Sequence, residues 1–155
     1  MEPVDIMKKH FEFLICDYGF LITEEKAASP SYLGALIKYT SKLTQVLVGM
    51  DRADVYIVMG RSDITRNELF EFTYVINYLN PAIEKPYKLH TELNKPLEGS
   101  IDIQSKFLSE LMQENCKQIL LSGFTPEMEK QIREIEKKKV EWFLSVLKQK
   151  GKIKG

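Results

Sequence analysis

The chain has 155 residues, of which 44% are hydrophobic and 28% charged, and its 22 basic residues balance its 22 acidic ones. This composition is typical of a folded chain with a sizeable core, and the length fits one domain over residues 1–155. A net charge of zero gives no global field that would favour nucleic acid or an anionic membrane, so neither is expected as a partner.

The N-terminal residues predict a cytoplasmic protein because they lack the apolar core of a signal peptide. No apolar run approaches the roughly 18 residues that a membrane-spanning helix needs. Cys16 and Cys116 lie in expected helices without CxxC spacing or a neighbouring histidine. We interpret both as small buried hydrophobic side chains.

A first helix is expected from Asp5 to Tyr18, where apolar residues recur at the spacing of one helix face. Asp5 can cap its start, and Gly19 suits the left-handed conformation that often follows a last turn. A short strand over residues 20–24 and a polar connection over residues 26–31 are expected next.

Three β-branched and aromatic runs separated by short polar breaks predict an antiparallel meander over residues 34–60. Residues 35–40 alternate in character, which is typical of a strand with one solvated face. Residues 46–48 and 55–59 are apolar on both faces. Such strands usually lie in the middle of a sheet, covered on both sides by helices, loops or a partner chain.

Residues 65–79 are apolar on nearly every side and predict a helix, with Ser62 and Asp63 as candidate N-caps. Their aromatic and β-branched content also permits a strand over residues 70–78, so both interpretations stay open. Residues 81–99 show no period, and a loop of this length in a compact domain is often functional.

A helix over residues 101–121 is expected to stop at Gly123. The last helix should begin after Thr125, with a proline at its first position, and run to about Lys148. Residues 150–155 are expected to be a frayed tail. The apolar stripe of this last helix consists of Met128, Ile132, Ile135, Val140, Phe143, Leu144 and Leu147. Together the elements predict an α+β fold, with an antiparallel sheet of about four strands packed against an N-terminal helix and two to three C-terminal helices.

No pattern of residues indicates catalysis, a cofactor or a metal. His10 and His90 are the only histidines, and neither has further ligands at a metal-binding spacing. Turn chemistry explains Asp51 and Asp54, because aspartates bond nearby backbone amides. The lysines late in the last helix complement its dipole, with anion binding as a minor alternative. We therefore predict no catalytic, cofactor-binding or metal-binding residue, and no cofactor.

The order helix, strand, meander and helices resembles a loose group of small uncharacterised bacterial α+β proteins. The resemblance rests on residues 13–20 at the first helix–strand junction, residues 37–41 in the second strand, and residues 46–55 in the hairpin. Some similar proteins are immunity proteins that bind and neutralise a toxin. The matched positions are structural, so the resemblance implies a binding role and carries over no catalytic residue.

The leading hypothesis is a non-enzymatic, cytoplasmic protein-binding domain of the immunity or accessory type. Its candidate contact residues are Asp51, Arg52 and Asp54 in one turn and Tyr87, Leu89 and His90 in the 81–99 loop. An alternative is a small-molecule-binding or enzymatic domain with a pocket between sheet and helices. A homodimer through the last helix or the sheet is the third hypothesis.

Overall fold

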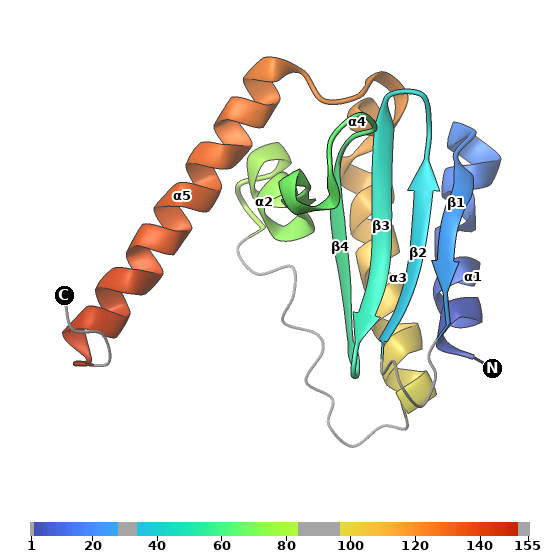
Figure 1. The fold of residues 1–155 in the computed structure, drawn as a ribbon, viewed down its shortest axis with the longest axis horizontal. Coiled ribbons are helices and arrows are strands. Elements are labelled where there is room, and N and C mark those ends of the chain that lie inside the picture. Colours follow the sequence, from blue (N-terminus) through green and yellow to red (C-terminus); the bar gives the residue numbers. More distant parts are fainter. Residues whose placement is uncertain (1, 28–33, 84–96, 152–155) are drawn as a thin grey trace.

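The computed structural model describes residues 2–27, 34–83 and 97–151. The fold is α+β, as predicted, and its sheet is antiparallel with five strands in the order β1-β2-β3-β4-β5, one more than expected (Figure 1). The elements in chain order are α1 Pro3–Tyr18, β1 Leu21–Lys26, β2 Gly34–Thr40, β3 Thr44–Asp51, β4 Asp54–Arg61, the 3₁₀ helix η1 Arg66–Glu68, β5 Phe70–Glu71, α2 Phe72–Leu79, α3 Leu97–Asn115, α4 Lys117–Ser122 and α5 Pro126–Gln149.

The core lies between one face of the sheet and the helices α1 and α3, which lie side by side behind the strands in Figure 1. Its largest fully buried side chains include Met7, Phe11, Leu14, Ile37, Tyr39 and Ile101. The apolar spacing that predicts α1 therefore marks the face that the helix buries. Side chains pack behind Tyr39, in the layer between the sheet and the helices where the alternative hypothesis placed a ligand pocket.

The meander over residues 34–60 is confirmed, and β3 at its centre is buried on both faces up to Met50. In β4 burial alternates, and Tyr56 is only half-buried on the face away from the helices. The Tyr56 ring lies across Gly49 of β3, so closely that a Cβ at Gly49 would lie 2.3 Å from the ring. The Tyr56 ring thus covers part of the face of β3 that we expected helices, loops or a partner chain to cover.

The two edges of the sheet differ from its centre. On β1 five of the six residues are exposed, and its pairing with β2 is interrupted by a bulge between Ile22 and Glu24. The opposite edge, β5, is only two residues long and pairs with Val58 and Met59 of β4. Long regular pairing is therefore confined to β2, β3 and β4.

The ends of α1 show one expected and one unexpected feature. Gly19 has φ 71°, and its N–H donates to the carbonyl of Ile15, as expected for a left-handed cap. The predicted cap at Asp5 is wrong, because the helix begins at Pro3 and its N-cap is Glu2. Proline is favoured at the first helical position, which explains the start at Pro3. Asp5 lies in the first turn, where its negative charge interacts favourably with the helix dipole.

Residues 62–79 combine both interpretations that the sequence left open. After a turn, the segment forms the 3₁₀ helix η1, pairs with β4 as β5 and continues directly as α2. Ser62 and Asp63 cap no helix and lie in the turn after β4. The Ser62 hydroxyl donates instead to the Lys42 carbonyl at 2.8 Å, which ties this turn to the β2–β3 turn.

The helix predicted over residues 101–121 begins earlier and is divided into α3 and α4 at Cys116. Just before the break, the Asn115 side chain donates to the Leu111 carbonyl at 2.9 Å, a local bond that competes with the helix ladder. Cys116 is buried as expected. The same expectation is wrong for Cys16, which is exposed on the solvent side of α1.

The last helix is confirmed as α5, and the Thr125 hydroxyl accepts a hydrogen bond from the Met128 N–H at 3.1 Å. No helix in the described ranges is both long enough and apolar enough to cross a membrane. The candidate contact residues Tyr87, Leu89 and His90, most of the predicted 81–99 loop and the tail after residue 151 lie outside the described residues.

Candidate functional site

The β3–β4 turn holds the three described contact candidates, Asp51, Arg52 and Asp54, and all three are exposed. Arg52 occupies a left-handed conformation with φ 59°. The shape of the turn is fixed from α3, because the Gln104 side chain donates to the Ala53 carbonyl at 2.7 Å. The turn lies at the far end of the sheet from the linker that leads into α5 (Figure 1).

A cleft of about 310 Å³ lies at the other end of the sheet, where the β2–β3 turn, the end of β4 and the α4–α5 linker meet. It is lined by Lys42, Leu43, Arg61, Ser62, Asp63, Ser122, Gly123 and Phe124. The sequence-based alternative placed a pocket between the sheet and the helices, and this cleft lies beyond that layer.

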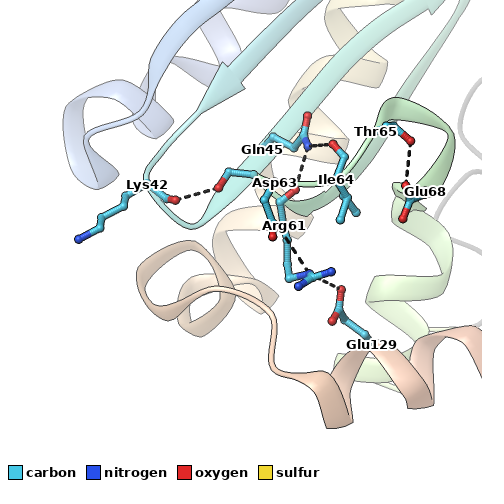
Figure 2. Close-up of polar contacts among 9 residues, drawn as sticks. Lys42, Gln45, Arg61, Asp63, Ile64, Thr65, Glu68 and Glu129 are labelled. Carbon is cyan, nitrogen blue, oxygen red and sulfur yellow. Dashed lines mark hydrogen bonds and ion pairs between the residues drawn. The ribbon is translucent and has the colours of Figure 1, made fainter.

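Arg61 dominates the electrostatics of the cleft, and its charge is already compensated. Its Nε lies 3.0 Å from a Glu129 carboxylate oxygen on α5 and 3.7 Å from the Asp63 carboxylate (Figure 2). The Lys42 side chain points away from Arg61. Gln45 is buried and donates to the Arg61 and Ile64 carbonyls at 2.8 and 2.9 Å. The residues of the cleft therefore connect α5 to the sheet, and the pairing of Arg61 with two carboxylates disfavours an anion there.

A histidine–carboxylate pair bridges α1 and α3. His10 Nε2 lies 2.6 Å from Asp102 Oδ1, and the Lys9 ammonium lies 3.5 Å from the same oxygen. The hydrogen bond from His10 is the main cause that holds the pKa of Asp102 below its usual value. An ionised carboxylate only accepts, so Nε2 carries the proton. In the part of the chain that the structure describes, no group of three His, Cys, Asp or Glu side chains could hold a metal.

The first half of α5 is firmly anchored, and we call residues 126–136 the root. Glu129 pairs with Arg61 at the end of β4, and Ile132 is fully buried. The Arg133 guanidinium lies 4.8 Å from the centre of the Phe70 ring on β5, a cation–π contact. These contacts set the direction in which the rest of the helix leaves the molecule.

The second half of α5, residues 137–150, projects away from the sheet, and we call it the arm (Figure 1). Its exposed large apolar residues are Val140 (47%), Trp142 (68%), Phe143 (55%) and Leu144 (49%). Five lysines and one glutamate give the arm a net charge of +4 in a chain whose net charge is zero. The arm is therefore both the most apolar exposed helix surface and a basic one.

A groove of about 500 Å³ lies between α2 and α5, where the arm begins, and Asn77, Pro81, Ile135 and Lys139 line it. We call it the α2–α5 groove. The Asn77 side-chain nitrogen is buried and has no hydrogen-bond partner among the described residues. With 8 residues against 24, α2 is roughly 12 Å long and α5 roughly 36 Å. The arm thus begins where α2 ends.

Sequence reasoning identified the apolar stripe of the last helix but not that half of it lacks a neighbour. A signal was present in residues 142–144, where a tryptophan, a phenylalanine and a leucine follow one another two residues after three consecutive lysines. No protein-family model matches this chain, and comparisons with curated proteins and with solved structures find no match either.

Proposed function

We propose that this protein is a non-enzymatic protein-binding module whose contact surface is the α5 arm. One observation carries the proposal: Val140, Phe143 and Leu144 share one face of a projecting helix segment and are each exposed by about half, and Trp142 on the opposite side of the segment is 68% exposed. Scattered exposed apolar residues are normal, but a contiguous patch is a mark of an interaction site. An amphipathic helix face is also a common means of protein recognition.

The size of the patch indicates what the partner must supply. Trp142 and Phe143 expose roughly 250 Å² together, taking aromatic side chains as burying about 150–250 Å² each. At about 25 cal/mol per Å², covering them would contribute on the order of 6 kcal/mol. Association itself costs at least about 4 kcal/mol, so a stable complex needs further contacts beside the two rings.

An immunity-type or accessory role in the cytoplasm is the biological setting that we propose for this module. Such proteins act by contact rather than by chemistry, and the sequence resemblance over residues 13–55 supports this setting. A toxin-like reading frame directly upstream of the gene would support the immunity role, and a position among unrelated metabolic genes would count against it.

Photo-crosslinking in the native host tests the binding proposal. A photoreactive phenylalanine derivative placed at Phe143, on the apolar stripe, should form one stoichiometric adduct with a second protein. Leu121 on α4 is the matched control, because its exposure of 58% is close to the 55% of Phe143 and it lies outside the arm. The derivative at Leu121 should give no such adduct. If position 143 gives no protein adduct, the arm is not a protein-binding surface and the proposal fails.

A further inference from the structure

We infer that the arm binds an acidic amphipathic helix, which lies in the α2–α5 groove and along residues 137–150. The inference rests on the proposed function and specifies the chemistry of the partner. The place it assigns begins at the α2–α5 groove, where α2 ends.

The geometry of the two helices defines this place. The root of α5 packs against α2, and the groove lined by Pro81 and Ile135 opens at the end of α2. Beyond it the apolar stripe of α5 continues to Phe143 without α2 beside it. A helix of about 14 residues, roughly 21 Å long, would cover the arm from the groove to its end. An added helix can continue the packing that α2 begins, because both would lie on the same stripe.

Charge selects an acidic partner. Lys137, Lys138 and Lys139 begin the arm and Lys148 and Lys150 end it, and all five are exposed. Lys139 also lines the α2–α5 groove itself. Helical spacing places all of these lysines except Lys138 at the two borders of the apolar stripe, whereas Lys138 lies opposite it. Lysines that flank an apolar helix seam select glutamates at the flanking positions of the facing helix. A second copy of this chain would bring an equally basic arm to the same place, so charge disfavours pairing between two arms.

Asn77 supplies an independent observation in the groove. Its amide nitrogen is buried without a partner in the described part of the chain, although the residue lines the groove. A buried donor without an acceptor costs free energy, and a bound carboxylate or carbonyl oxygen would satisfy it. An acidic side chain near one end of the partner helix is such an acceptor.

Two synthetic peptides of 16 residues test the inference. They carry leucines at identical positions of one helix face, and their other positions are filled with glutamate in one peptide and with lysine in the other. Trp142 is the only tryptophan of the chain and lies on the side of α5 away from the stripe. Both peptides are therefore titrated against the double variant Trp142→Phe with Phe143→Trp, whose single tryptophan lies on the stripe and whose emission reports on it directly. We expect the glutamate peptide to shift this emission to shorter wavelength and to gain helical circular dichroism on binding, because a helix this short is marginal alone.

Variants identify the charges involved. The double variant Lys137→Glu with Lys139→Glu should weaken binding of the glutamate peptide at least tenfold. The control Lys130→Glu, on the exposed side of the root, should change binding less than twofold. Raising the sodium chloride concentration from 50 to 500 mM should weaken binding by the wild-type protein, since exposed charges are screened.

Other outcomes would overturn the inference. Equal binding of both peptides, preference for the lysine peptide, or binding of neither would each reject an acidic helix. A shift of this emission with protein concentration alone would assign the arm to a second copy. A larger shift with phosphatidylglycerol vesicles than with the glutamate peptide would assign it to a membrane surface. If position 143 crosslinks to a protein but the glutamate peptide does not bind, only the acidic helix is rejected, and the binding module stands.

Discussion

The exchange of Gln104 for methionine tests how α3 supports the sheet. Gln104 is 2% exposed, and its side chain accepts from the Val55 N–H at 2.9 Å and donates to the Ala53 carbonyl at 2.7 Å. Val55 lies near the first residue of β4, at the end of the strand that β5 does not reach, because β5 pairs only with Val58 and Met59. Methionine has a similar length and no hydrogen-bonding group that could replace the amide.

The expected loss follows mainly from these two bonds, since the third, from the Gln104 amide to the Ser100 hydroxyl at 3.1 Å, joins two residues of α3. Leaving the buried Val55 N–H without an acceptor costs about 1–3 kcal/mol, and losing the partly solvated bond to Ala53 costs about 1 kcal/mol. Gln104→Met should therefore lower the free energy of unfolding by about 2–4 kcal/mol. For a chain of this length the melting temperature should fall by on the order of 10 °C.

Urea unfolding followed by circular dichroism at 222 nm measures this loss, and calorimetry gives the melting temperature. The matched control is Gln113→Met, which makes the same exchange at an exposed position of α3 and should leave stability within about 0.5 kcal/mol of wild type. If Gln104→Met is as stable as Gln113→Met, the turn is not held by α3 and the reasoning is refuted.

Three further predictions concern the helices. Phe143→Ser, at an exposed position, should change the free energy of unfolding by less than about 0.5 kcal/mol, whereas Phe11→Ala in the core should lower it by about 3–5 kcal/mol. Urea titrations measure both values, and equal losses would show that the arm is packed. Iodoacetamide at pH 8 should modify the exposed Cys16. Burial raises the pKa of Cys116 to about 12, so this thiol should react only after unfolding. Peptide mass spectrometry identifies the modified cysteine, and modification of Cys116 in the native protein would contradict the prediction. The pKa of Asp102 is lowered in the folded chain, so its contribution to stability is present above the ordinary aspartate pKa of about 3.9 and is lost as the pH falls through the lowered value. Asp102→Asn should therefore be less stable than wild type at pH 7, and the two stabilities should converge in acid. Urea titrations that show the same difference at every pH would argue against the pair with α1.

Local signals in the sequence predicted local structure well. Gly19 and Thr125 each mark a helix end through one backbone conformation or one hydrogen bond, and both function as expected. The features that sequence reasoning missed depend on residues far apart in the chain. The break at Cys116 accompanies a side-chain bond from Asn115, which also contacts Asn80.

The candidate site was the least predictable part for the same reason. Amphipathic periodicity shows that the face from Met128 to Leu147 is apolar, but it cannot show where the neighbouring helix ends. The length of α2 depends on the β5 pairing and on the chain turn at residues 80–83, neither of which the periodicity of α5 reflects. The contact candidates Asp51, Arg52 and Asp54 were correctly placed on an exposed turn, and their binding role stays a prediction.

The edges of the sheet bear on how this chain can assemble. A flat, regular edge strand is a template for another strand, but β1 presents charged residues and a bulge, and β5 offers only two residues for pairing. Growth of the native fold into stacked cross-β filaments is therefore disfavoured from both sides. Concentrated native protein should therefore give no signal with amyloid dyes.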